Sequence, residues 1–291
     1  MLLLTENNMI ELFIIGIYLI IASYSDFKTR EVPDILSFTF IALGIMFNLA
    51  RTIIFWDISY IAFSIAGSIA LIILSLILFY GGQWGGGDAK LLIGIGAWYG
   101  ITLFEFPKLI TFLVNMLIFG AVYGVIYAIY LALSNRSKIK EYMNEQGKKL
   151  IVSKRIIRIA VIIMIISAIL LWENQIAILF FSLAVLMFFG FYALIFVRAI
   201  ESKVLIKTIS ITKLTEGDWV LDTIKKGKTV YFTPKKTGVS KQDIILLQKL
   251  HSQKIIKEVK VKDGIPFIPS FLIAFIITEI AGTWFLRILN L

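Results

Sequence analysis

The chain has 291 residues, of which 59% are hydrophobic and only 16% are charged, with a mean hydropathy of +0.89. These values exclude an ordinary soluble globular domain. The chain has no cysteine and one histidine, His251, which excludes disulfides, thiolate or histidine metal centres and a Ser-His triad. We therefore expect no metal and no cofactor, and any chemistry must come from carboxylates.

Apolar runs near the roughly 20 residues needed to cross a bilayer follow one another along the chain. They predict about eight transmembrane helices, at residues 9–25, 34–55, 58–80, 89–105, 109–133, 156–172, 175–197 and 266–289. Residues 1–11 lack a basic start, and no small-residue cleavage pattern follows, so no cleavable signal peptide is expected. The fold class is an all-α polytopic membrane protein.

Residues 198–265, before the last predicted helix, have a different pattern. Three β-branched or alternating runs predict strands, and two glycine-containing segments predict turns. The strands are expected at Val204–Ile211, Thr229–Thr233 and Ile255–Val261, and the turns at Glu216–Asp218 and Lys226–Gly227. Ser240 predicts the N-cap of a short helix with Asp243 at its third position, and His251 is expected on the solvated surface of that helix. This segment should form a small basic α+β domain docked on the membrane core.

Lysine and arginine accumulate in three of the segments between the predicted spans. These are the loop with Lys28 and Arg30, residues 136–155, and residues 198–262. Because basic residues resist translocation, these segments are expected on the cytoplasmic face, which places the N-terminus outside. The net charge of +10 then favours orientation in the cell membrane and attraction to anionic lipid over nucleic-acid binding.

The segment Gly85-Gly86-Gly87-Asp88-Ala89-Lys90 places a carboxylate at the start of a hydrophobic helix, directly after three glycines. Asp26 ends the first predicted span, and two apolar passes lie between the acids, so both should reach the cytoplasmic boundary. Two carboxylates forced close share one proton, as in aspartic proteases. The ionised acid can then activate water while the protonated acid donates to a peptide carbonyl. The glycines permit close approach of a substrate strand.

Other interpretations of these acids are possible. Asp26 alone could be a solvated residue at a helix boundary, and the glycine tract could line a transporter cavity. A phosphate-binding loop is disfavoured, because the tract lacks the Gly-Lys-Ser/Thr ending. Glu279, near the middle of the last span, is either part of a mechanism or a hydrogen-bonded acid at a helix contact.

Gly85, Gly87 and Asp88 form a Gly-x-Gly-Asp pattern that continues as Ala89-Lys90-Leu91-Leu92, and the first loop reads Asp26-Phe27-Lys28-Thr29-Arg30-Glu31-Val32-Pro33-Asp34. Over residues 1 to about 130, these two motifs resemble the type IV prepilin peptidases and their archaeal relatives, the preflagellin (archaellin) peptidases, which are GxGD membrane aspartic proteases. Asp34 stands where that family more commonly has Asn. Presenilin-like proteases share the glycine motif, but their catalytic acids lie on consecutive helices, whereas two spans intervene here.

The resemblance implies that Asp26 and Asp88 are catalytic and that Gly85, Gly86 and Gly87 supply the motif backbone. It implies an endopeptidase that removes a short basic leader from precursors with a hydrophobic N-terminal helix, at the cytoplasmic boundary of the membrane. The lack of cysteines and the short first loop favour the archaeal kind, which has no N-methyltransferase activity. The alternatives are a proton-coupled transporter and a non-catalytic filament assembly factor.

The expected division of the chain follows from these assignments. It is a catalytic transmembrane core (1–135), a basic cytoplasmic loop (136–155), two additional transmembrane helices (156–197), the small basic domain (198–265) and the final transmembrane helix (266–291).

Overall fold

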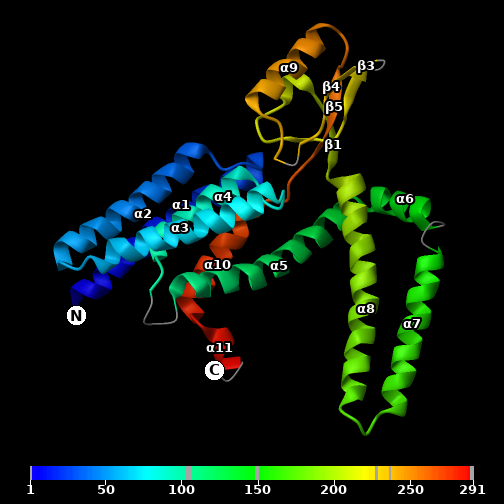
Figure 1. Cartoon of the computed structure of the whole chain (residues 1–291), viewed down its shortest axis with the longest axis horizontal. Helices are drawn as coiled ribbons and strands as arrows, with labels where there is room; N and C mark the ends of the chain where they lie inside the picture. Colours follow the sequence, from blue (N-terminus) through cyan, green and yellow to red (C-terminus); the bar gives the residue numbers. More distant parts are fainter. Residues whose placement is uncertain (1, 103–106, 148–150, 227–228, 236, 289–291) are drawn as a thin grey trace. The chain divides into compact units, whose positions relative to one another are not determined.

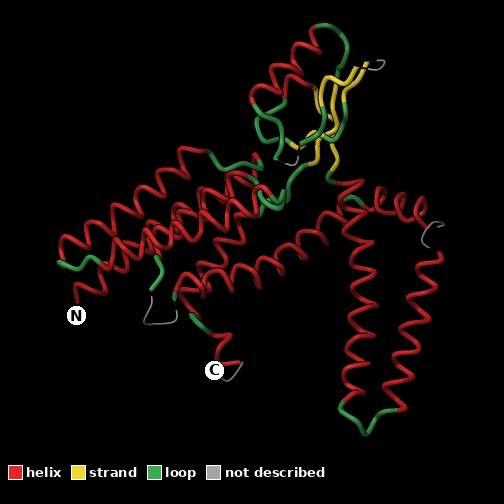
Figure 2. Tube along the Cα trace, viewed as in Figure 1, coloured by secondary structure: helices red, strands yellow, loops and turns green. Residues whose placement is uncertain are grey.

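The structure is a computed structural model that describes residues 2–102, 107–147, 151–226, 229–235 and 237–288. It is mainly helical, and strands occur only near residues 206–262 of the described chain (Figures 1 and 2). Two compact units form: residues 1–126 together with 208–291, and residues 127–207.

The larger unit contains a helical bundle. Its helices are α1 (Leu2–Thr29), α2 (Asp34–Phe55), α3 (Ser59–Tyr80), α4 (Gly86–Tyr99), the start of α5 (Lys108–Ser134), α10 (Ile268–Ala281) and the short α11 (Trp284–Ile288). Helix α4 packs against both α2 and α3, beside which it lies in Figure 1, and α1 packs against α10. The core between them is apolar, with Phe40, Leu92 and Phe271 fully buried.

Small residues let α3 and α4 approach closely. A Cβ added at Gly67 would lie 2.5 Å from the carbonyl oxygen of Gly96, and one added at Gly96 would lie 2.5 Å from that of Gly67. Two serines of α3 also donate to carbonyls of α4, Ser64 to Ala97 at 2.6 Å and Ser75 to Ala89 at 2.9 Å. Close backbone contact and interhelical hydrogen bonds hold helices together where lipid gives no hydrophobic drive.

The smaller unit begins with the end of α5. It continues with α6 (Arg136–Gly147), α7 (Ile151–Leu170), α8 (Ile176–Ala199) and a π-helix, η1 (Ile200–Val204). Helices α7 and α8 form a hairpin (Figure 1). Lys203 of η1 bonds Glu141 at 2.8 Å and Glu145 at 2.9 Å, which fixes η1 on α6.

Every predicted span corresponds to a helix, although not all are long and apolar enough to cross a membrane by themselves. Among the described residues, five stretches meet that requirement: Met9–Thr29, Asp34–Phe55, Ser59–Tyr80, Lys108–Ser134 and Ile176–Val204. The chain is thus a polytopic helical membrane protein, and the count of eight stays a prediction.

Two predicted boundaries are wrong. The helix expected at 89–105 ends at Tyr99, because Gly100 adopts φ +62° and Ile101 donates to the carbonyl of Phe63; positions 103–105 lie outside the described residues. The continuous helix expected at 266–289 breaks at Gly282, where φ is +55°, and position 289 is not described. In the segment expected as a basic cytoplasmic loop, 136–155, the described residues form α6 and the start of α7, and its place relative to the membrane stays a prediction.

The small domain has the predicted α+β character. Its elements are β1 (Ile206–Ser210), a 3-10 turn η2 (Ile211–Lys213), β2 (Trp219–Val220), β3 (Ile224–Lys226), β4 (Thr229–Phe232), α9 (Lys241–Ser252) and β5 (Glu258–Lys262). The strands form a sheet of order β1-β5-β2 and a separate β3-β4 hairpin, both seen in yellow in Figure 2. In the larger sheet, β2 and β5 run antiparallel with Val220 opposite Val261. Leu247 and Leu250 of α9 pack into the core of this domain.

Each predicted strand corresponds to one in the structure, but β2 and β3 were not predicted from the sequence. The turn expected at Lys226–Gly227 lies partly outside the described residues. His251 is half-buried rather than fully solvated, because its Nδ1 bonds the carbonyl oxygen of Ile256 at 3.0 Å.

The predicted N-cap of α9 is confirmed. The amide of Asp243 donates to the Ser240 hydroxyl at 3.3 Å, and the amide of Ser240 donates to Asp243 Oδ2 at 2.9 Å. Lys235 also donates to Asp243 at 2.6 Å. Burial opposes ionisation of Asp243, but these donors outweigh it and lower the pKa of its carboxyl.

Asp243→Asn is expected to lower the thermal unfolding temperature of the full-length protein in detergent at pH 7. Because the folded-state pKa is depressed, the contribution is present above the ordinary value of 3.8 and is lost as pH falls below it. The difference from wild type should therefore shrink on acidification. Glu258→Gln, at an exposed strand position, is the matched control, and an equal deficit at neutral and acidic pH would contradict the prediction.

Candidate active site

Asp26 lies in the last turn of α1, with its residue only 5% exposed. A carboxylate there meets the negative end of its own helix dipole. The first turn of α10 compensates: the amide of Ile268 donates to Asp26 Oδ2 at 2.9 Å. The amide of Phe267 and the charge of Arg30 also interact favourably with this carboxylate. Asp26 therefore bridges the end of one helix and the start of another.

Asp88 is the third residue of α4, whose N-cap is Gly85. Its Oδ2 accepts the amide of Gly85 at 3.3 Å, so the carboxylate caps the helix that carries it. Asp26 is near enough for its charge to act on Asp88. Each of the two carboxyls thus accepts a hydrogen bond from a backbone amide at a helix start.

The three glycines of the motif have different surroundings. A Cβ on Gly87 would lie 3.1 Å from both the amide nitrogen and the Cβ of Val32, in the loop that follows Asp26. On Gly86 it would lie 3.7 Å from Phe79, and on Gly85 3.5 Å from Asp88 Oδ2, which are ordinary contacts. Gly87 is thus the glycine that lets the two motifs touch.

An ion pair also joins the two motifs. Lys90 Nζ lies 2.6 Å from Asp34 Oδ1, and the Asp34 side chain is 68% exposed. The lysine that follows Asp88 by two positions and the acid at the end of the first loop are therefore partners. An exposed pair of this kind contributes about 0–1 kcal/mol, so its role is alignment more than stability.

The first turn of α10 is the part of the site that sequence reasoning missed. Besides the amides on Asp26, it carries Phe267 and Phe271, whose ring centroids lie 5.5 and 5.7 Å from that of Trp84. Trp84 directly precedes Gly85. In the sequence, Gly-Ile-Pro-Phe-Ile-Pro at residues 264–269 indicates the start of a helix. It does not indicate that this helix start lies against Asp26 and Trp84.

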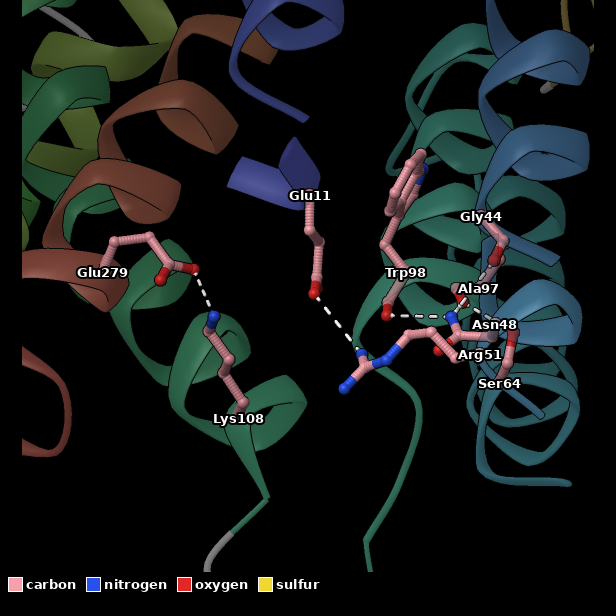
Figure 3. A network of polar contacts seen from close by, with 9 residues as sticks. All are labelled: Glu11, Gly44, Asn48, Arg51, Ser64, Ala97, Trp98, Lys108 and Glu279. Atoms are coloured by element: carbon pink, nitrogen blue, oxygen red, sulfur yellow. Dashed lines mark hydrogen bonds and ion pairs between the residues drawn. The ribbon is translucent and has the colours of Figure 1, made fainter. Parts of the chain in front are cut away.

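Glu279 belongs to a separate network at the other end of α10, shown in Figure 3. Lys108 pairs with Glu279 at 2.7 Å, and the hydroxyl of Tyr99 donates to the same carboxylate at 2.7 Å. Nearby, Arg51 pairs with Glu11 at 3.6 Å. Glu279 lies eleven residues after Ile268, or about 16 Å along the helix, so it is apart from the aspartates.

The arrangement provides two carboxyl groups at one end of the bundle, and the charge of Asp26 acts on Asp88. Such a pair can hold a single proton and supply one acid and one base. Among the described residues, no group of three or more His, Cys, Asp or Glu side chains is arranged to hold a metal ion.

Comparison with known proteins points to a family of membrane peptidases. Residues 13–125, which contain both aspartates, match the sequence model of the Type IV leader peptidase family. The chain is also similar to the preflagellin peptidase of Methanococcus maripaludis, with 40% identity over 89 residues, and to that of Methanocaldococcus jannaschii, with 40% identity over 86 residues.

These matches cover 31% and 29% of this chain, and the chain spans 38% and 36% of those two relatives. No solved structure matches the chain significantly. The resemblance drawn from the two motifs is confirmed, and residues 13–125 carry it.

Gly87→Ala is expected to reduce the activity of the protein at least tenfold, roughly the cost of displacing a reacting group by about 1 Å or less. The added methyl would press on the backbone of Val32 and move Asp88 away from Asp26. Gly86→Ala, one residue earlier in the same helix, is the matched control and should stay near wild type. Equal losses in both variants would contradict the steric argument.

Glu279→Gln is expected to lower the thermal unfolding temperature and leave the reaction rate unchanged. The change removes the charge that pairs with Lys108 but keeps an acceptor for Tyr99. Rate and unfolding temperature should be measured on the same detergent preparation. A lost reaction with unchanged stability would show that Glu279 takes part in the mechanism.

Proposed function

We propose that the protein is a membrane-embedded aspartic endopeptidase that removes a short basic leader from pilin-like or archaellin-like precursors. The observation that carries this proposal is the pair Asp26 and Asp88, at one end of the bundle and inside the region that matches leader peptidases. The names of the two relatives support an archaellin-type client. The precursor's hydrophobic helix would lie in the bilayer beside the spans.

In this mechanism the two carboxyls have different protonation states. Asp26 accepts the shorter amide bond, at 2.9 Å against 3.3 Å for Asp88, which supports Asp26 as the ionised base. Asp26 takes a proton from water as the water oxygen adds to the peptide carbonyl carbon. Asp88 donates its proton to the carbonyl oxygen. As the tetrahedral intermediate collapses, Asp26 gives its proton to the amide nitrogen and Asp88 takes the proton of one hydroxyl. The C–N bond breaks, a carboxylic acid and an amine leave, and both aspartates return to their starting states.

The proposal includes the arrangement of the chain in the membrane. Eight spans, an external N-terminus and a cytoplasmic active site agree with the basic segments around residues 28–30, 136–155 and 198–262. The division then runs from a catalytic core (1–135), through the basic segment (136–155) and two further helices (156–197), to the small domain (198–265) and the last helix (266–291). We include no N-methyltransferase activity and no metal or cofactor.

The alternatives are not favoured. A proton-coupled transporter would place its carrier acid near the middle of the membrane, whereas both aspartates lie at helix ends. A non-catalytic assembly factor would not need two acids whose charges interact.

The test compares wild type, Asp26→Asn and Asp88→Asn on a precursor with a basic leader before a hydrophobic helix. Each asparagine keeps an oxygen that accepts the amide bond, so the helix ends stay capped while the acid is removed. Cleavage by the purified variants should fall by a factor of about 100 or more, the usual contribution of an acid or base.

Asp57→Asn is the matched control, because Asp57 is exposed and only caps Ser59 at 2.9 Å. It should cleave like wild type. Retained cleavage in either active-site variant, with normal expression, would refute the two-acid mechanism.

A further inference from the structure

We propose that the first turn of α10, from Phe267 to Phe271, positions the catalytic pair, although it lies far outside the matched residues 13–125. This rests on the proposed function of Asp26 and Asp88. The turn touches both motifs at once, through backbone amides on one side and aromatic rings on the other.

The contact with Asp26 fixes one acid. The amide of Ile268, the first residue of α10, has no partner within its own helix and donates to Asp26 Oδ2 at 2.9 Å. Pro269 follows within the first turn, where its fixed φ suits a helix start. The donor is therefore part of a rigid helix end, and it holds the carboxylate in one direction.

The contact with Trp84 fixes the segment before the other acid. The rings of Trp84, Phe267 and Phe271 form a cluster in which all three centroid separations lie between 5.5 and 5.8 Å. Phe271 is fully buried in the bundle core, so the cluster is anchored. Because Trp84 directly precedes the motif glycines, its ring limits how far Gly85–Asp88 can move from Asp26.

Phe267 is thus a positioning residue rather than a catalytic one. It does not hydrogen-bond through its side chain, and it acts through Trp84 and through the backbone it shares with Ile268. Its loss should displace the acids without changing substrate binding. Effective placement of reacting groups is sensitive to shifts of about 1 Å.

The first experiment measures kcat and KM for Phe267→Ala, Trp84→Ala and the double variant. Each single change should lower kcat about tenfold with little change in KM, as expected for a loss of alignment. Because Trp84 and Phe267 contact each other, the two losses in kcat should be less than additive in the double variant. Phe267→Tyr and Trp84→Phe keep an aromatic ring and should restore most of kcat.

Phe275→Ala is the matched control. Phe275 is a buried phenylalanine two turns further along α10, and its ring lies beside Gly16 of α1. It should lose stability but keep kcat. Unchanged kcat in either alanine variant, additive losses in the double variant, or an equal kcat loss in Phe275→Ala would overturn the proposal.

The second experiment does not depend on activity or on the alanine variants. The natural chain has no cysteine, so Trp84→Cys with Phe267→Cys gives a clean pair for a short thiol cross-linker, detected by mass spectrometry of the joined peptides. The pair is placed in Asp88→Asn protein in membranes. We expect cross-linking, and much less for Trp84→Cys with Phe275→Cys, about 12 Å further along the helix. The proposal would be overturned if the first pair did not cross-link, or if both pairs cross-linked to the same extent.

The two proposals fail in different ways. If wild type does not cleave the precursor, or if Asp26→Asn and Asp88→Asn still cleave, the proposed function fails. If cleavage requires both acids but Phe267→Ala and Trp84→Ala match wild type, only the role of α10 fails.

Discussion

The hydrogen bond from the Ile268 amide to Asp26 is the interaction on which the geometry of the candidate site depends. A carboxylate in the last turn of a 28-residue apolar helix meets the negative end of that helix in a medium that solvates charge poorly. Such a group needs a donor, and the positive end of α10 provides one. The bond spans 242 positions of the sequence, so it also brings α10 against α1.

The second acid is placed by packing rather than by charge. Helix α4 can lie between α2 and α3 because small residues face one another: Gly67 and Gly96 bring backbones together, and Gly94 admits the ring of Phe40. At the start of α4, Gly87 does the same against Val32. Because of this tight fit, α4 has little freedom to slide along its own axis. Its axial position in turn determines where Asp88 lies relative to Asp26. The Lys90–Asp34 pair then aligns the same two segments at the surface.

Features that depend on local sequence were predictable. The apolar runs gave the helices, Ser240 and Asp243 gave the cap of α9, and the two aspartate motifs gave the family resemblance that residues 13–125 carry. Features that depend on backbone conformation or distant contacts were not. Gly100 and Gly282 end helices by adopting positive φ within apolar sequence that would otherwise continue. The strands β2 and β3 are only two and three residues long, too short to give a periodic pattern. The role of Ile268 depends on its amide, which every non-proline residue has.

The site therefore combines parts with different sequence signatures. In the proposed mechanism the side chains that exchange protons must be acids, and both of these acids lie within the matched residues 13–125. An amide that holds an acid, and a ring that packs on Trp84, can be supplied by many sequences, so these contacts of the first turn of α10 do not follow from residue type alone. The matched residues 13–125 contain both aspartates and omit the first turn of α10, to which we assign their alignment. A boundary drawn at residue 125 would separate Asp26 from the Ile268 amide that donates to it, so the unit that we propose to be functional extends beyond the matched residues.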